Sequence, residues 1–407
     1  MTLSKTLDEM HAWMFDDALP FWSENGIDKN YGGFIEELDF SGKDAARPFK
    51  RIRVTCRQVY VFAHAKMMGW NDAEDLIARG VEFLTSKARR EDGGFMRRVN
   101  RDGTPLDPTA DLYDTAFALF AFAWAFRATG DIAYRDLAAQ TFTWVHDNMR
   151  HPTGEGFWHA RPAEGPRQQN PHMHFLEASI AANDALHMQG IGDDGLYKEC
   201  IGEITNLFRT RFFNKETQTL TEFFNDELAP ADGQDGIITE PGHHLEWAWI
   251  LRNCERVLST DLSLEIDKLI EFAERHGINR QGAVMNSVKA SGPPIDAGSR
   301  TWPNTERLKA AIALLQGPPQ KRAGAAKRDA TKMVEQSGRL LLDRYLGKNP
   351  NPNSSTIPMG TIPRGTWIDA FDEHGKSIAE RIPASTFYHI FLAFAELLDN
   401  RDKLCTE

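Results

Sequence analysis

The chain has 407 residues and a formal net charge of −11, and 41% of its residues are hydrophobic. This acidic balance disfavours nucleic acid or an anionic membrane surface as the main partner, and the sequence contains no apolar run long enough to span a membrane. Its four cysteines are far apart and form no CxxC pair, so we expect neither a disulfide framework nor a zinc ribbon. The opening residues contain no apolar signal stretch, and a cytoplasmic location is the resulting expectation.

Apolar residues recur at helical spacing along most of the chain, which predicts an all-α protein. In the segment that ends at Gly130 they surround the predicted helix almost completely, as is typical of a helix buried on most sides. Glycine also suits the position that follows the end of a helix. The predicted helices, in chain order, span residues 3–20, 50–68, 73–89, 110–129, 132–149, 172–189, 194–212, 242–257, 262–276, 301–316, 326–346 and 382–400.

Short segments of strand-like character separate alternate helices, and most of them open on glycine. The first five recur at intervals of about 60 residues, which is the signature of a repeat protein. Each repeat would consist of two helices and a short hairpin or loop. The segments begin at Gly32, Gly93, Gly154, Thr219, Gly282 and Gly365.

Six helix pairs predict an (α/α)6 barrel with the β-hairpin inserts gathered at one end. A linear solenoid would need polar caps at both ends, whereas alternate helices here are apolar enough to be packed inside a ring. No linker rich in proline, glycine or serine divides the chain, so residues 1–407 are predicted to form one domain. The loose basic stretch 316–329 is predicted to be an exposed connection within it.

Three segments from different repeats carry histidines that could do chemistry. His174 and Glu177 lie one turn apart on one helix face, and so do His243 and Glu246. His389 lies inside a very apolar helix, where a lone histidine is more often a hydrogen-bonded core residue because burying a charge is costly. Two histidines that face one cavity could act as base and acid, since the unperturbed pKa of histidine is about 6.5.

A zinc site built from these histidines and a glutamate is the alternative use of the same groups. The sequence has no HExxH-type spacing, because Glu246 stands three residues after His243 and not directly after it. We therefore predict no metal and no other cofactor.

Arginine and aromatic residues supply the remaining candidates. Arg53 and Arg57 are neighbours on one helix face that is otherwise apolar, so they are either rim charges paired with carboxylates or groups that face a cavity. A buried arginine in a cavity would stabilise an oxyanion such as an enediolate. Trp302 and Glu306 stand at the start of a later helix, where Trp302 could stack on a sugar ring; Tyr113 is a similar candidate.

Five segments occur in an order that resembles the N-acylglucosamine 2-epimerase superfamily over nearly the whole chain: VTCRQVYVF, NPHMHFLEA, EPGHHLEWAW, RTWPNTE and STFYHIF. The resemblance implies an (α/α)6 barrel that needs neither metal nor nucleotide cofactor. It places His243 and His389 in the acid and base roles and gives Arg57 the role of holding an enediolate. The expected substrate-binding residues are His174, Glu246, Trp302, Glu306, Tyr113, Asn170 and Arg53.

The resemblance favours an aldose–ketose isomerase that interconverts D-mannose and D-fructose, or D-lyxose and D-xylulose, through a cis-enediolate. The alternative is a 2-epimerase acting on mannose or glucose, cellobiose or an N-acylglucosamine. A sulfoquinovose isomerase and a phosphorylated sugar are disfavoured, because the stretch before His243 has no basic residue and no phosphate-binding glycine loop is evident.

An (α/α)6 glycoside hydrolase remains open, since the acidic residues of the predicted helices could supply the two carboxylates that it needs. A sugar- or protein-binding barrel without catalysis is the third class. The expected partner is a small monosaccharide, with no nucleic acid or membrane, and both a monomer and a homodimer remain open.

Overall fold

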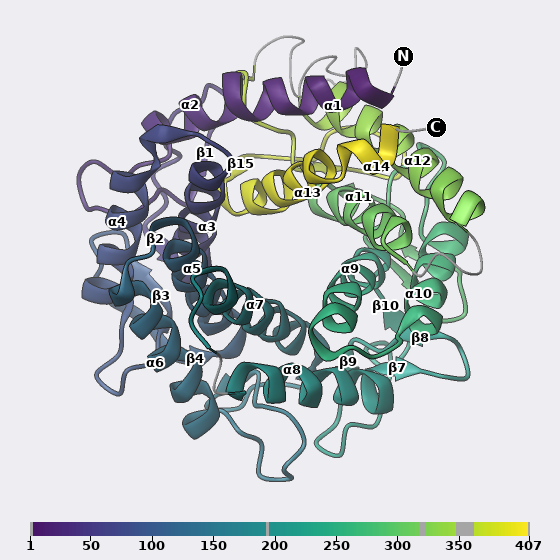
Figure 1. The fold of residues 1–407 in the computed structure, drawn as a ribbon, viewed down its shortest axis with the longest axis horizontal. Helices are drawn as coiled ribbons and strands as arrows, with labels where there is room; N and C mark the ends of the chain where they lie inside the picture. Colours follow the sequence, from purple (N-terminus) through teal and green to yellow (C-terminus); the bar gives the residue numbers. More distant parts are fainter. Residues whose placement is uncertain (1–2, 193–194, 318–322, 347–361, 406–407) are drawn as a thin grey trace.

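The computed structural model describes residues 3–192, 195–317, 323–346 and 362–405. Six helices follow one another around the centre, each in contact with the next, and the last of them contacts the first, so that the inner ring is closed (Figure 1). These inner helices are α3 (Ile52–Met67), α5 (Leu112–Thr129), α7 (Gln169–Met188), α9 (Pro241–Leu258), α11 (Thr301–Leu315) and α13 (Phe387–Asp399).

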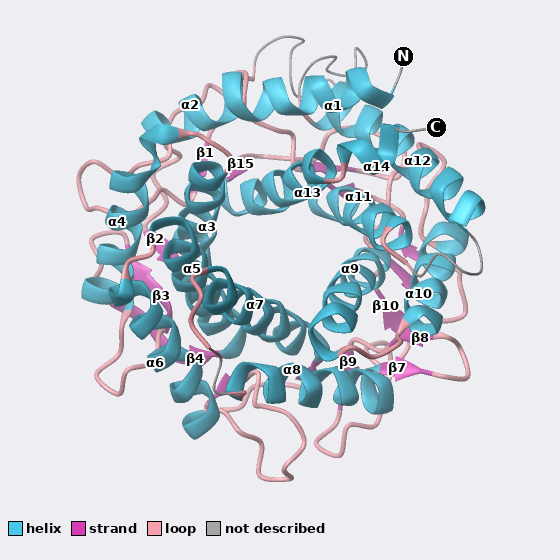
Figure 2. Ribbon diagram, in the orientation of Figure 1, coloured by secondary structure: helices cyan, strands magenta, loops and turns pink. Residues whose placement is uncertain are grey.

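A second set of helices packs around the outside of this ring, as the cyan helices of Figure 2 show. Outer helices bury mainly one face, whereas the inner helices have neighbours on several sides and are buried over most of their surface. The outer helices are α1 (Leu3–Ala12), α2 (Leu19–Asn25), α4 (Glu74–Phe83), α6 (Ile132–Asn148), α8 (Leu196–Leu207), α10 (Ser263–His276) and α12 (Ala323–Leu340); α14 (Arg401–Cys405) follows the last inner helix.

Helix α5 illustrates how local sequence sets the ends of an inner helix. The Asp111 side chain caps its start by accepting a hydrogen bond from the backbone N–H of Asp114. Gly130 ends it in a left-handed conformation, with φ of +71°. Between these two signals almost every side chain is buried, which confirms the sequence prediction for this segment.

The strands are short, antiparallel and placed just before the inner helices. A strand ends within three residues of the start of every inner helix, so the hairpins gather at the N-terminal ends of that ring. The strands are β1 (Glu37–Leu38), β2 (Phe49–Arg51), β3 (Met96–Asn100), β4 (Pro105–Asp111), β5 (Ala160–Arg161), β6 (Arg167–Gln168), β7 (Phe213–Asn214), β8 (Thr219–Leu220), β9 (Phe223–Phe224), β10 (Ile238–Thr239), β11 (Ser287–Lys289), β12 (Pro294–Asp296), β13 (Ser299–Arg300), β14 (Ala370–Phe371) and β15 (Ile382–Pro383).

Pairing between strands ties neighbouring repeats together. The largest sheet has the order β2–β3–β4–β5 and links the first three repeats. β1 pairs with β15, with Glu37 opposite Pro383 and Leu38 opposite Ile382, so this pair joins segments far apart in the sequence. Each of the six strand-like segments predicted from the sequence contains at least one of these strands.

Several helix boundaries differ from the prediction: residues 50–51 and 110–111 belong to β2 and β4, and α7 begins at Gln169 and not at residue 172. The first helical stretch continues through a π-helical turn to Asn25. Residues 382–383 form β15, which pairs with β1, and α13 begins at Phe387 after a short 3-10 turn. Helix α12 begins at Ala323, so 323–329 is helical and not a connection, while 318–322 lie outside the described residues. No helix among the described residues is both long and apolar enough to cross a membrane.

Candidate active site

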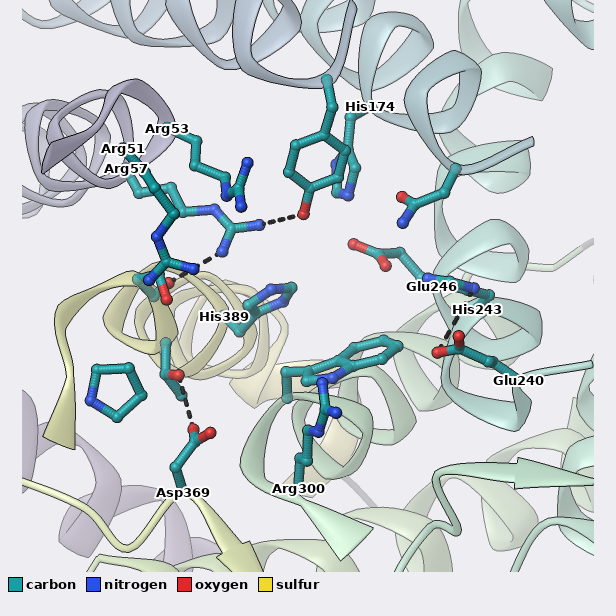
Figure 3. A pocket seen from close by; sticks show the side chains of 16 residues that line it. Arg51, Arg53, Arg57, His174, Glu240, His243, Glu246, Arg300, Asp369 and His389 are labelled. Atoms are coloured by element: carbon teal, nitrogen blue, oxygen red, sulfur yellow. Dashed lines mark hydrogen bonds and ion pairs between the residues drawn. The ribbon is translucent and has the colours of Figure 1, made fainter. Parts of the chain in front are cut away.

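A cavity of about 370 Å³ lies at the N-terminal ends of the inner helices (Figure 3). Nine of the ten predicted site residues line it, and the tenth, Glu306, lies just beneath and bonds to His389. The lining residues are Arg51, Arg53, Arg57, Tyr113, Asn170, His174, Glu240, His243, Glu246, Arg300, Trp302, Asp369, Pro383, Ser385, Thr386 and His389.

A common position within the helices explains why these residues converge. Arg53 and Arg57 are the second and sixth residues of α3, and Asn170 and His174 hold the same two positions in α7. Residues four apart lie on one face of a helix, and here that face is turned to the centre of the ring. The N-termini of the same helices point their positive dipole ends at the cavity, which favours a developing anion there.

His243 is buried beside carboxylates on one side of the cavity. Its Nδ1 lies 2.9 Å from Oε2 of Glu222 and 3.8 Å from Oε2 of Glu240. The side-chain amide of Gln169 donates to the same Glu222 oxygen at 2.8 Å and accepts from Nε1 of Trp247 at 2.6 Å, which fixes the carboxylate. Burial alone would lower the pKa of His243, but Glu222 and Glu240 raise it to about 10, so the ring is protonated at neutral pH.

His389 is equally buried but has the opposite electrostatic surroundings. Its Nδ1 lies 2.9 Å from Oε1 of Glu306. Burial, followed by the positive charges of Arg57 and Lys309, lowers the pKa of His389 well below its usual range. The ring of His389 is therefore neutral under conditions in which His243 is charged.

The indole of Trp302 lies between the two histidines. Its ring centroid is 5.2 Å from that of His243 and 5.7 Å from that of His389. Gly242 allows this packing, because a Cβ at that position would stand 2.6 Å from the Trp302 ring. The spacing of the two histidines therefore depends on a close contact between α9 and α11.

Arg57 faces the cavity as a cation without a described carboxylate partner within 4 Å. It donates to the hydroxyl of Tyr113 at 2.8 Å and to the backbone carbonyl of Ser385 at 3.3 Å. Its guanidinium packs over the rings of Phe117 and Tyr388 at 4.3 and 4.9 Å. These contacts hold the charge in place without neutralising it, so it is available to an anion.

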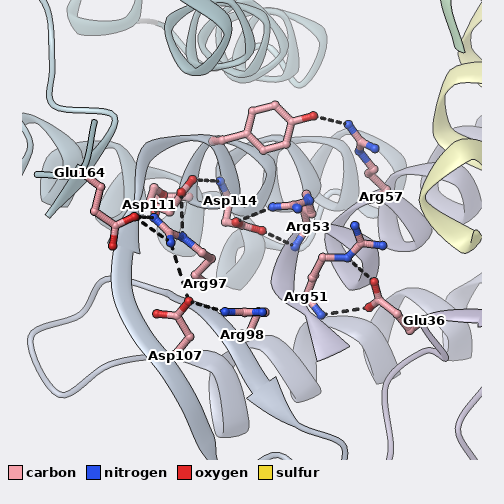
Figure 4. A network of polar contacts seen from close by, with 12 residues as sticks. Glu36, Arg51, Arg53, Arg57, Arg97, Arg98, Asp107, Asp111, Asp114 and Glu164 are labelled. Atoms are coloured by element: carbon pink, nitrogen blue, oxygen red, sulfur yellow. Dashed lines mark hydrogen bonds and ion pairs between the residues drawn. The ribbon is translucent and has the colours of Figure 1, made fainter. Parts of the chain in front are cut away.

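Arg53 differs, because it is one of a row of arginines that are paired with carboxylates (Figure 4). Its side chain and backbone N–H donate to the two oxygens of Asp114, each at 2.9 Å. Arg51 is paired in the same way with Glu36. Arg53 lines the cavity as predicted, and its ion pair matches the alternative that it is a rim charge.

A buried charge network forms the floor of the cavity. His174 Nδ1 lies 3.0 Å from Oε2 of Glu177, and the Tyr388 hydroxyl donates to Glu177 at 2.7 Å. Lys309 Nζ lies 2.6 Å from Oε2 of Glu306 and 3.8 Å from Oε1 of Glu246. All of these side chains are buried.

Two overlapping sets of these groups have ligand-type atoms within 4.8 Å of one another: His174, Glu177 and Glu246, and Glu246, Glu306 and His389. The Lys309 ammonium stands against two of the three carboxylates and already supplies the positive charge that a cation would bring. We therefore assign these groups to an ion-pair and hydrogen-bond network and not to a metal site.

Sequence reasoning missed two kinds of residue. Arg51 and Arg300 are the last residues of strands that lead into inner helices, and both line the cavity. The expectation against a phosphorylated or sulfonated sugar considers basic residues only in the stretch before His243, so it does not include these two arginines. Glu222 contacts His243, and Lys309 contacts Glu246 on a neighbouring helix. The sequence does not show either contact; it shows only that Glu222 lies in a predicted hairpin.

A model of the N-acylglucosamine 2-epimerase (GlcNAc 2-epimerase) family matches residues 33–348. A mannose-6-phosphate isomerase of Rhizobium meliloti (strain 1021) is 34% identical over 408 residues, which cover 96% of each chain. Among solved structures, the cellobiose 2-epimerase from Bacillus thermoamylovorans B4167 has a TM-score of 0.81 at 18% identity, covering 98% of this chain and 100% of that chain. A D-mannose isomerase has a TM-score of 0.78 at 17% identity, covering 98% and 97%. The chain belongs to the N-acylglucosamine 2-epimerase family, whose members are sugar isomerases and epimerases.

Proposed function

We propose that the protein is an aldose–ketose isomerase that interconverts D-mannose and D-fructose, with a sugar 2-epimerase as the alternative. The observation that carries this proposal is the pair of buried histidines that line one cavity, one protonated and one neutral, with the cation of Arg57, which has no carboxylate partner among the described residues, beside them. A neutral and a protonated imidazole are the base and acid that a proton transfer next to a carbonyl requires. We also infer that the closed inner ring and its outer helices form one (α/α)6 barrel domain.

In the proposed mechanism, His389 is the base. The open-chain aldose binds with C2 near Nε2 of His389, which removes the C2 proton. The C–H electron pair forms the C1–C2 double bond, and the carbonyl electrons move to O1. Arg57 and the proton of His243 stabilise the charge on O1, helped by the N-terminal ends of the inner helices.

The second proton transfer decides the product. If His389 returns its proton to C1 while the proton on O2 passes to O1, the C2–O2 carbonyl forms and the product is the ketose. If His243 delivers a proton to C2 from the opposite face, the product is the 2-epimer. Trp302 packs near both histidines, so its position and the placement of the sugar between them set the balance.

A phosphorylated mannose is the second candidate substrate. Two observations favour it: Arg51 and Arg300 line the cavity, and the relative that is 34% identical is named a mannose-6-phosphate isomerase. The family does not by itself distinguish the free sugar from its phosphate. A glycoside hydrolase is less well supported, because Glu177 and Glu306 lie in the buried network and do not line the cavity.

Incubation with candidate sugars in D2O, followed by NMR, tests the proposal. The panel comprises mannose, fructose, glucose, lyxose, cellobiose and mannose 6-phosphate. A ketose that carries deuterium at C1 supports isomerisation, whereas a deuterated C2 epimer without ketose supports the alternative. Hydrolysis of cellobiose to glucose would favour a glycosidase, and binding without deuterium exchange or a new sugar would overturn the enzymatic proposal.

A further inference from the structure

Lys309 is a fully buried lysine at the centre of the inner ring, and none of the proposed steps uses it. It lies three residues after Glu306 on α11, and its ammonium contacts the Glu306 carboxylate at 2.6 Å. On α9 it faces the Glu246 carboxylate at 3.8 Å and the ring of Trp249 at 4.4 Å. It is not among the residues that line the cavity, so it cannot act by touching the sugar.

The surroundings of Lys309 are dominated by negative charge. Glu177 of α7 also acts on it electrostatically, so three buried carboxylates from three helices share this one ammonium. On α13 Lys309 also acts electrostatically on His389 and on the carboxylate of Glu396, which accepts a hydrogen bond from Nε1 of Trp249. His174 and Arg57 act on the same His389. The pKa of Lys309 is raised, because the carboxylates outweigh the burial that would lower it, and the lysine is charged.

The bond between Glu306 and His389 can hold its proton in two ways. If Glu306 is a carboxylate, it accepts from Nδ1–H of His389, and Nε2 is left with the lone pair that a base needs. If Glu306 carries the proton, it donates to Nδ1, and Nε2 then bears the hydrogen and cannot act as a base. Burial and the Glu246 carboxylate raise the pKa of Glu306 well above its usual range, and Lys309 is the group that opposes them most. What favours the carboxylate is the position of the Lys309 ammonium, 2.6 Å from Oε2 of Glu306.

We propose that Lys309 is a positioning residue that holds Glu306 as a carboxylate and thereby fixes His389 in the tautomer that can accept a proton at Nε2. The inference rests on the proposed function for the catalytic consequence, but the tautomer itself is a property of the resting protein. The Lys309 ammonium supplies the positive charge that keeps Glu306 ionised beside His389. It does so from inside the core, where it does not touch the substrate.

Lys309→Met removes the charge and keeps the length of the side chain. We expect kcat near pH 7 to fall about 100-fold, with KM changed less than about threefold. We also expect kcat of the variant to rise with pH above 7 as Glu306 loses its proton, which the wild type does not show. In Lys309→Met/Glu306→Gln this rise should disappear, because the titrating group is gone. A loss that is the same at every pH, or a kcat within twofold of the wild type, would overturn the proposal.

The matched control is Lys50→Met, since Lys50 is also a buried lysine, paired with Asp28 at 3.1 Å away from the cavity. It should lower the melting temperature without changing the pH profile of kcat. A comparable change in that profile would show that loss of any buried lysine produces the effect.

Long-range 1H–15N NMR of 15N-histidine-labelled protein gives a second readout that needs no turnover. With the His389 signals assigned from His389→Gln, the wild type should carry its proton on Nδ1, and Lys309→Met should carry it on Nε2 at neutral pH. An Nε2–H tautomer in the wild type overturns the inference even if Lys309→Met fails to fold. If no sugar in the panel reacts, the proposed function fails while the tautomer still tests the role of Lys309.

Discussion

The two sides of the cavity use the same side chain in opposite ways. His243 and His389 are 7% and 6% exposed, and each has a carboxylate 2.9 Å from Nδ1. Around His243 the further neighbours are Glu240 and Glu246, and the pKa rises to about 10 although burial opposes it. Around His389 the Glu246 carboxylate is also close, but burial, followed by the positive charges of Arg57 and Lys309, lowers the pKa well below the usual range.

The comparison teaches that the first hydrogen-bond partner does not set the role of a buried histidine. Glu222 is held by Gln169 and the backbone of Glu240 and has no lysine partner among the described residues, so its charge acts on His243. Glu306 is already paired with Lys309, so less of its charge reaches His389. The second set of neighbours therefore separates the acid from the base.

Removing either histidine should have the largest effect. His243→Ala and His389→Ala should each lower kcat at least about 1000-fold, because each removes one proton-transfer group. Exchange of the C2 proton in D2O distinguishes them: it should persist slowly in His243→Ala and vanish in His389→Ala. Exchange that survives only in His389→Ala would reverse the assignment, and near wild-type turnover in either folded variant would contradict the acid and base roles. Circular dichroism verifies that each variant is folded.

Arg57→Met should lower kcat about 100-fold, since it removes a fixed donor for the enediolate oxygen. Because Arg57 is also one of the cations that lower the pKa of His389, the acid limb of the pH–rate profile should move to higher pH. Arg57→Lys keeps the charge and should restore part of both effects. A higher KM with an unchanged kcat would show that Arg57 binds the ground state and does not act on the intermediate.

Glu222→Gln should lower kcat about tenfold near neutral pH, less than loss of the histidine itself. Glu222 is the main group that raises the pKa of His243, so the alkaline limb of the profile should move to lower pH. Glu240→Gln serves as a control that removes a more distant charge and should produce a smaller movement in the same direction. An unchanged alkaline limb in Glu222→Gln would mean that His243 is not the titrating acid.

Stability should depend on pH through the same group. The pKa of His243 is about 10 in the folded protein and 6.5 for an ordinary histidine, so the folded state binds more protons between these values. This contribution is complete below pH 6.5 and is lost as the pH rises toward 10, by up to about 1.4 kcal/mol per pH unit. Urea titrations at several pH values should show this slope in the wild type and a shallower one in His243→Ala; equal slopes would contradict it.

Metal removal should have the smallest effect. Because Lys309 already occupies the carboxylate cluster, dialysis against EDTA should leave kcat unchanged within experimental error. Lys309→Met after the same dialysis tests whether the cluster then takes up zinc. Complete loss of wild-type activity with EDTA and its recovery with zinc would contradict the assignment of these groups to an ion-pair network.

Much of the site could be predicted because its residues occupy equivalent positions near the starts of helices with a clear repeat. Asn170 and Trp302, for instance, are both the second residue of an inner helix, a place that short local motifs reveal. The partner of His243 could not be predicted, since Glu222 comes from a hairpin 21 residues earlier and its approach depends on tertiary packing. The start of α13 was placed too early, because an apolar segment with helical spacing does not show that its first residues pair with β1.

Pairs of site residues such as Arg53 and Arg57 lie at the second and sixth residues of inner helices, and this placement has a consequence for insertions and deletions. A change in hairpin length alters the strand and the turn. It leaves the start of the helix in place, so the same helix residues still face the centre of the ring. One residue inserted between Arg53 and Arg57 would rotate everything after it by about 100° and turn Arg57 away from the centre. Relatives should thus differ in length mainly within the hairpins and should keep the four-residue spacing between Arg53 and Arg57.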